Sequence, residues 1–83
     1  HKYIMKSFKE IQRSSQKGDY TRVAQMVGTS PSTVRMVVGG YRIDYYNIQK
    51  VCSDILEHRE KINEREDRRR KKQAARELKL QAA

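Results

Sequence analysis

The sequence predicts an all-α protein of four helices, the last of which runs on into a long charged extension. Apolar residues recur every three or four positions in four separate segments, which is the spacing of one helix face. Glycine-containing turns separate these segments. After Ile62 the apolar spacing stops while the helix propensity stays high. We therefore expect a helical domain over residues 1–62 and a basic, charged helical tail over residues 63–83.

The first predicted helix is amphipathic and short. It should end near Ser14, because the polar run that follows leads to Gly18, a residue that favours a helix end. Asp19 is then placed to cap the next helix, since its carboxylate can accept hydrogen bonds from the free N–H groups of a first turn. The inward side of the first helix is marked by four residues at helical spacing: Ile4, Phe8, Ile11 and Ser15.

The second and third predicted helices have about two turns each and are nearly adjacent. Gly28 ends the second helix, at residues 20–27, because glycine adopts a positive φ without steric cost. Ser30 then acts as the N-cap of the third helix and Pro31 as its first residue, where the missing N–H costs nothing. The paired glycines 39 and 40 end the third helix. The inward faces of the two helices are formed by small and branched residues: Val23, Ala24, Val27, Val34, Val37 and Val38.

The fourth predicted helix has the strongest apolar periodicity. Asp44 is expected to cap it after a short connection at residues 41–43. Its inward face should pack across the first three helices and close the core. A helix from Asp44 to the end of the chain would have 40 residues and a length of roughly 60 Å, longer than the domain itself. The inward residues are Ile48, Val51, Cys52, Ile55 and Leu56.

The charge balance indicates a polyanionic partner. The chain has 19 Lys and Arg against 10 Asp and Glu, a formal net charge of +9. Residues 1–62 carry a net +5 and residues 63–83 a net +4, so both parts are basic. The run from Arg68 to Lys72 could follow a DNA backbone, bind RNA or remain a solvated helix face. Acidic residues stand three or four positions from basic ones, as intrahelical pairs would, which favours a self-sufficient helix.

Several function classes lack the residues that they need. The single cysteine, Cys52, cannot form an internal disulfide, and its apolar neighbours favour a small buried hydrophobe in a reducing, cytoplasmic setting. His1 and His58 have no second ligand at metal spacing, so we expect no metal and no cofactor. The sequence contains neither a glycine-rich phosphate loop nor a set of nucleophile and base, so we expect no enzyme and no small-molecule substrate.

Two further expectations concern the setting of the chain. The apolar runs are too short for a bilayer or a secretory signal, so we expect no membrane partner. Because the chain begins with His1 and not with Met, we also expect a fragment of a longer protein or the remnant of a tag.

Residues 20–39 have the spacing of two short helices that cross closely. Ala24 allows a close approach, Gly28 accommodates the turn and Val34 packs back from the second helix, while three more valines seal the contact: Val23, Val27 and Val37. This stretch resembles the helix-turn-helix family of phage and bacterial repressors at the alanine, the glycine and each apolar position. The resemblance implies a repressor-like domain that binds double-stranded DNA and regulates transcription. It also implies a bacterial or phage-infected cell and association with the nucleoid.

The resemblance further implies which residues contact DNA. Pro31–Val38 would be the recognition helix in the major groove, and the preceding helix would cross the backbone. Pro31 departs from the many relatives that carry a polar residue there, which shifts base reading to later positions. Four residues are expected to face outward and read bases: Ser32, Thr33, Arg35 and Met36. Five are expected to bind phosphates: Tyr20, Thr21, Arg22, Tyr41 and Arg42.

The sequence leaves alternatives open. Arg35 could bind phosphate, Met36 could merely shield the turn, and Arg22 could be an ordinary exposed side chain. An architectural or assembly protein that holds nucleic acid without regard to sequence fits the same charge, as does the DNA-docking module of a mobile-element recombinase or transposase. A homodimer is possible through residues 55–62 or through the two leucines near the end, but Arg65 and Arg69 interrupt the seam of a long coiled coil.

Overall fold

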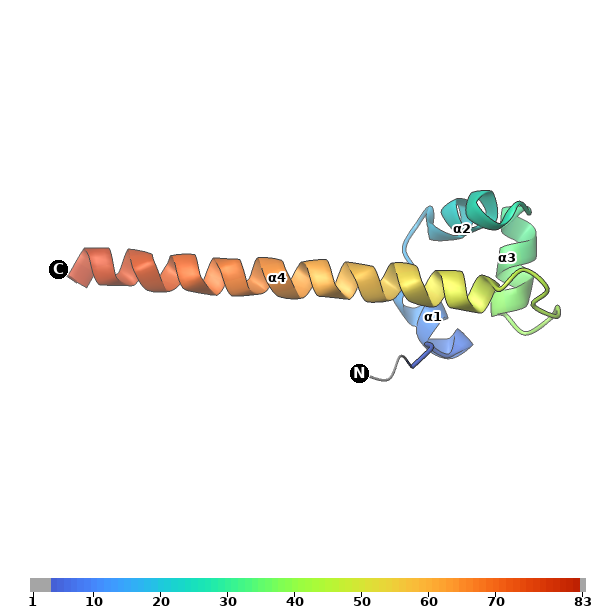
Figure 1. Ribbon diagram of the computed structural model, residues 1–83, viewed down its shortest axis with the longest axis horizontal. Coiled ribbons are helices and arrows are strands. Elements are labelled where there is room, and N and C mark those ends of the chain that lie inside the picture. The colour runs from blue at the N-terminus through green and yellow to red at the C-terminus, as the bar shows by residue number, and fades with distance from the viewer. Residues whose placement is uncertain (1–3, 83) are drawn as a thin grey trace.

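The computed structural model describes residues 4–82, and these residues form four α-helices and no strand. Three short helices, α1, α2 and α3, gather around the beginning of the long helix α4, and the rest of α4 projects away from them (Figure 1). The molecule measures 62 × 27 × 19 Å. The predicted all-α fold with a long C-terminal helix is therefore confirmed. The helices are α1 (Phe8–Ser14), α2 (Asp19–Val27), α3 (Pro31–Val38) and α4 (Ile48–Ala82).

Helix α1 begins later than predicted. The Ser7 side chain caps it by accepting a hydrogen bond from the Glu10 N–H. Ile4 precedes the helix and is 84% exposed, so its assignment to the inward face is wrong. The reason lies in α4: the Lys6 N–H donates to Ser53 Oγ at 2.9 Å, and Gln49 Nε2 donates to the Lys6 carbonyl at 3.0 Å. In a helix that began at Ile4, the Lys6 carbonyl would accept from the Glu10 N–H, but the carbonyl accepts from Gln49 and the Glu10 N–H donates to Ser7.

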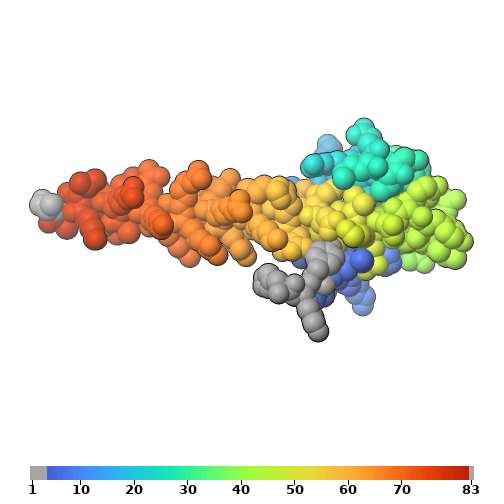
Figure 2. Space-filling model, viewed as in Figure 1, coloured from blue at the N-terminus to red at the C-terminus, as the bar shows by residue number. Residues whose placement is uncertain are grey.

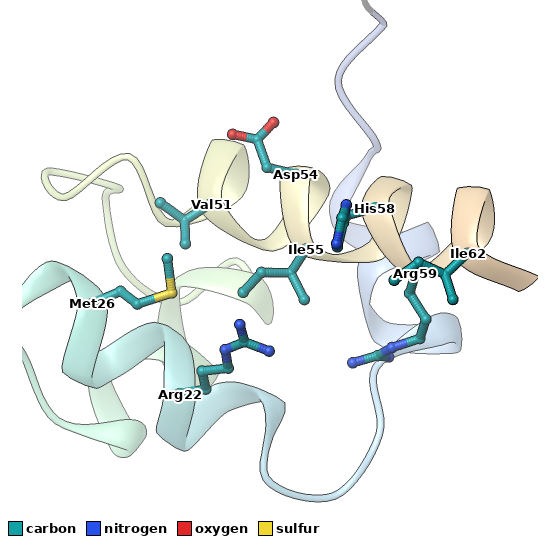
Figure 3. Close-up of a pocket in the computed structure, with 8 residues that line it drawn as sticks. All are labelled: Arg22, Met26, Val51, Asp54, Ile55, His58, Arg59 and Ile62. Atoms are coloured by element: carbon teal, nitrogen blue, oxygen red, sulfur yellow. The ribbon is translucent and has the colours of Figure 1, made fainter.

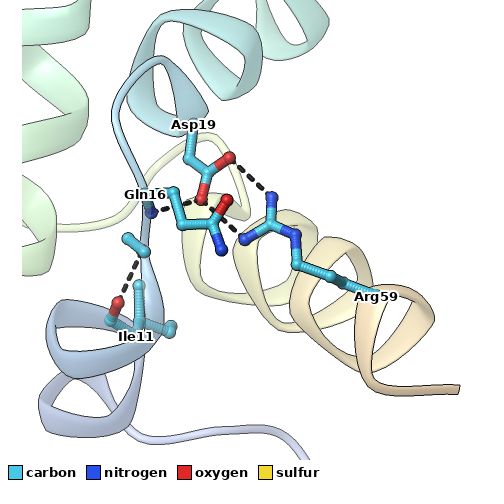
Figure 4. Close-up of polar contacts among 5 residues, drawn as sticks. Ile11, Gln16, Asp19 and Arg59 are labelled. Atoms are coloured by element: carbon cyan, nitrogen blue, oxygen red, sulfur yellow. Dashed lines mark hydrogen bonds and ion pairs between the residues drawn. The ribbon is translucent and has the colours of Figure 1, made fainter. Parts of the chain in front are cut away.

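The N-terminus of α2 also differs from the prediction. Gly18, with φ = +92°, occupies the N-cap position, and no side chain caps the helix. Asp19 is instead the first helical residue, and its carboxylate accepts hydrogen bonds from the Gln16 N–H at 2.7 Å and from both terminal nitrogens of Arg59 at 2.7 and 3.1 Å (Figure 4). The hydrogen bonds from Arg59 lower the pKa of Asp19 below its ordinary value. Asp19 therefore joins α2 to α4.

The ends of α2 and α3 agree with the sequence prediction. Gly28 ends α2 with φ = +79°, in the left-handed region that glycine tolerates. The Ser30 side chain caps α3 by accepting from the Thr33 N–H at 3.2 Å, and Pro31 is the first helical residue. At the other end, Gly40 has φ = +84° and the Tyr41 N–H donates to the Met36 carbonyl at 2.8 Å.

Helix α4 begins at Ile48, after a longer connection than predicted. Asp44 nevertheless binds its first turn, since the two carboxylate oxygens accept from the Ile48 N–H at 2.7 Å and the Gln49 N–H at 2.9 Å. Asn47, the residue before Ile48, has φ = +58°, a conformation that asparagine adopts more readily than most residues. The predicted capping role of Asp44 is thus confirmed, although Asp44 acts from within the loop.

The core lies where α4 meets the three short helices, each of which contacts it. Cys52 is buried there as predicted, and burial raises the pKa of its thiol to about 11. Every described residue of α4 after Arg59 is exposed, so α4 passes through the predicted boundary at residue 62 without a break. The buried apolar residues are Ile11, Val23, Ala24, Val34, Val37, Val38, Ile48, Cys52 and Leu56.

The pair between Asp19 and Arg59 predicts a pH-dependent stability. Arg59→Met should lower the free energy of unfolding by about 1–2 kcal/mol at neutral pH, because Asp19 loses two charge-assisted hydrogen bonds. The pKa of Asp19 is lowered in the folded state, so the stabilisation is present above the pKa of the unfolded chain and is lost as the pH falls through the folded value. Urea unfolding of both proteins should therefore show a difference that shrinks on acidification.

The matched control is Lys61→Met on the same helix. Lys61 pairs with Glu57 at 3.4 Å, and its side chain is 63% exposed. Its loss should cost less than about 0.5 kcal/mol. A deficit for Arg59→Met that stays the same in acid would mean that the arginine stem, and not the ion pair, stabilises the fold.

Candidate nucleic-acid interface

Helices α2 and α3 form a connected pair at one end of the molecule. Only Gly28, Thr29 and Ser30 separate them, and Figure 1 shows α3 turning away from the direction of α2. The buried valines of α3 and the buried pair Val23 and Ala24 of α2 belong to the same core cluster. This packing fixes one side of α3 against the protein and leaves the other side outward.

Three of the four predicted base-reading residues lie on the outward side of α3. Ser32, Arg35 and Met36 are exposed, and their spacing of three and four residues places them on one helix face. Met36 is 49% exposed although its side chain is apolar. This face combines a cation, a hydroxyl and an apolar side chain within one and a half turns of helix.

Thr33 does not belong to this face, and its predicted exposure is wrong. The residue is buried, at 9% exposure, between the exposed residues and the core. Its hydroxyl bonds to Ser30 Oγ at 3.0 Å and accepts from Arg42 Nη1 at 3.2 Å. Helical geometry explains the error: Thr33 neighbours the inward position of Val37 four residues later, so it lies at the edge of the packed side.

The contact with Thr33 brings Arg42 to the beginning of α3. Arg42 comes from the connection after α3, yet its guanidinium donates to Thr33 in the first turn of α3. The N–H of Thr33 in turn donates to the side chain of Ser30, the N-cap. The free N–H groups and the dipole make a helix N-terminus electropositive, and Arg42 adds a full charge there. The start of α3 is therefore an electropositive corner beside the exposed face.

The other predicted phosphate ligands are less uniform. Thr21 and Arg22 are exposed on the first turns of α2, and Tyr41 is exposed after α3. Tyr20 is half-buried and packs against the core, a contact that its sequence position did not reveal. The structure thus leaves Thr21, Arg22, Tyr41 and Arg42 accessible and gives Tyr20 a structural contact.

Sequence reasoning missed the character of the connection between α3 and α4. Four large side chains are exposed there, although aromatic and branched residues usually pack. The signal was present in the sequence, since these residues lack helical spacing and follow a double glycine. All four follow α3 within eight residues of its end: Tyr41, Ile43, Tyr45 and Tyr46.

A groove of about 370 Å³ separates α2 from α4 (Figure 3). Its apolar lining comes from Met26 on α2 and from three residues of α4: Val51, Ile55 and Ile62. Arg22 projects from α2 toward this groove, and His58 and Arg59 line it from α4. Arg22 therefore lies on the side of α2 that faces α4.

Within residues 4–82, no three histidine, cysteine, aspartate or glutamate side chains come close enough together to hold a metal ion. None of the helices over the same residues has the length and apolar content to cross a membrane.

Comparisons with protein-family models, with curated proteins and with solved structures gave no match to this chain.

The buried hydroxyl of Thr33 gives a direct test of the corner at the start of α3. Thr33→Val keeps the shape of the side chain but removes both hydroxyl contacts, so the free energy of unfolding should fall by about 1 kcal/mol. Thr21→Val, an exposed threonine on α2, should change it by less than about 0.5 kcal/mol. Chemical denaturation measures both. Equal effects would contradict the assigned role of the Thr33 hydroxyl.

Proposed function

We propose that this protein binds duplex DNA in a sequence-specific manner through α3 and regulates transcription by occupying its site. The observation that carries the proposal is the exposed face of Ser32, Arg35 and Met36. This face lies on a short helix that the Gly28 turn and the valine core hold rigidly against α2. An α-helix presented in this way fits the major groove of B-DNA.

The chemistry of the face matches the edges of base pairs. The Arg35 guanidinium can donate two hydrogen bonds to O6 and N7 of a guanine, and the Ser32 hydroxyl can bond to either kind of base. Met36 supplies an apolar surface for a thymine methyl group. Thr33 takes a different role from the predicted one, because it holds Arg42 beside the start of the recognition helix.

Backbone contacts would fix the register of α3. Thr21, Tyr41 and Arg42 flank the exposed face in the chain and carry donors for phosphate oxygens. The formal net charge of +9 adds a long-range attraction to DNA. Since one recognition helix reads only a few base pairs, we expect two copies of the chain on paired half-sites.

A second candidate function is an architectural protein that holds DNA without regard to sequence. The observation that favours it is the length of α4 that projects from the core, which is basic and in which every described residue after Arg59 is exposed (Figure 2). Competition with random duplex DNA distinguishes the two candidate functions. Sequence-specific complexes should survive an excess of random duplex at physiological salt, whereas architectural complexes should not.

Arg35→Ala tests the base-reading role. A selection of bound duplexes from a random pool should yield a motif with the wild-type protein, and the variant should lose preference at one base pair by about 1–3 kcal/mol. Arg13→Ala, an exposed arginine in the last turn of α1, is the matched control and should keep the motif. Identical motifs for the wild type and Arg35→Ala would refute the major-groove assignment of α3.

Arg42→Ala tests the phosphate-binding role. Because a phosphate contact carries no sequence information, binding should weaken alike for all duplexes, and the slope of log K against log salt should fall by about 0.9. The measurement is a salt titration of fluorescence anisotropy on a selected and on a random duplex. A changed motif with an unchanged slope would assign Arg42 to base reading instead.

A further inference from the structure

The charges of α4 are sorted by face after the helix leaves the core. Six basic residues fall within about 100° of arc on this helix, because each stands three or four positions from at least one other, which places them along one side. We call this side the basic stripe. Its members are Arg65, Arg68, Arg69, Lys72, Arg76 and Lys79.

The acidic residues of the same segment lie off the stripe. At about 100° per residue, Asp67 and Glu77 fall on the opposite half of the helix, and Glu64 and Glu66 fall on its two flanks. Within residues 4–82 no carboxylate lies within ion-pair distance of a stripe cation. The intrahelical pairing expected from the sequence therefore does not neutralise this side.

The stripe cations also come together in space. Arg65, Arg68, Arg69 and Lys72 line one shallow hollow on the surface of α4, together with Lys71. All five are exposed, and the whole segment stands clear of the other helices in Figure 2. Like charges held side by side on a rigid helix repel one another, so a polyanion that neutralises them gains binding free energy.

The stripe continues the side of α4 that forms the groove with α2. Ile62 is the last apolar member of that side, and Arg65 and Arg69 follow it at spacings of three and four. A second copy of α4 packed in parallel and in register along this side would place arginines against arginines. The charge pattern therefore disfavours self-association here and favours an anionic partner.

The stripe is separate from the exposed face of α3. Arg65 follows the start of α4 by 17 residues, or about 26 Å along the helix, and the stripe extends for about 21 Å more. Helix α3 lies at the beginning of α4 (Figure 1). A contact made by the stripe would thus add to a contact made by α3 and would not replace it.

We propose that the basic stripe is a second DNA-binding surface, which holds the phosphate backbone of duplex DNA without reading its sequence. A single α-helix with a diameter of about 10–12 Å fits a major groove about 12 Å wide. Duplex DNA offers one negative charge for about every 1.7 Å of its axis, enough to meet all six cations. The choice of duplex DNA among polyanions rests on the proposed function.

Two adjacent arginines test the stripe. Arg69→Gln removes a stripe cation and Arg70→Gln removes a cation from the other side of the helix, with the same loss of charge. The full chain is titrated with a short random duplex at several salt concentrations, and circular dichroism checks the helix content. Arg69→Gln should lower the salt slope by about 0.9 and the affinity by three- to tenfold near 0.1 M salt, whereas Arg70→Gln should change the affinity less than about twofold. Arg65→Gln combined with Arg69→Gln should lower the slope by about 1.8.

Equal losses for Arg69→Gln and Arg70→Gln would show that only net charge matters and would overturn the proposal, as would no loss for Arg69→Gln. The same pair is titrated with polyglutamate and with single-stranded RNA. A difference between the variants that occurs with either of these but not with the duplex overturns the proposal in favour of an acidic protein or an RNA.

The selection of duplexes by Arg35→Ala, taken together with this titration, separates this inference from the proposed function. If Arg35→Ala leaves the selected motif unchanged while Arg69→Gln still lowers the salt slope, the stripe stands and the α3 assignment fails. If the motif changes and the slope does not, the α3 assignment stands and the stripe fails.

Discussion

The fold depends on the burial of one side of the first three turns of α4. Helices α1, α2 and α3 have 7, 9 and 8 residues, too few for any of them to be stable alone in water. Ile48, Cys52 and Leu56 supply the apolar surface against which all three pack. Because the orientation of α3 follows from this contact, the exposed face of Ser32, Arg35 and Met36 owes its position to residues far from it in the chain.

The sequence predicted the local features well, because capping and turn chemistry act within a few residues. Gly28, the Ser30–Pro31 pair and the glycines after α3 were assigned correctly for this reason. The errors occurred where a distant residue competes with local preference. Ile4 lies outside α1, where the side chains of Ser53 and Gln49 bind the backbone of Lys6, and Asp19 lies one residue inside α2, where its carboxylate binds Arg59. Such partners are 40 or more residues away, and spacing rules cannot identify them.

The candidate site shows the same division. Exposure of Ser32, Arg35 and Met36 followed from helix periodicity, but Thr33 lies at the border between the two faces, where periodicity alone does not decide. Its hydroxyl is buried because Ser30 and Arg42 supply hydrogen-bond partners, which removes the cost of burying a polar group. The sequence showed the cations of the tail as a run, whereas only their arrangement on a straight helix shows that they share a side.

Helix α4 has two segments, one packed in the core and one exposed, and the two need different residues to remain helical. Its first turns need apolar residues to form a core, and its later turns need enough helix propensity to stay folded without one. Residues 63–82 meet the second demand with arginine, lysine, glutamate, glutamine, alanine and leucine, all of which favour helices. A disordered basic tail of the same composition would have to be ordered on binding DNA, at a cost in conformational entropy. A helix that propagates from the core has already lost that freedom, so its cations are held in one line before a partner arrives, and more of their attraction is retained as affinity.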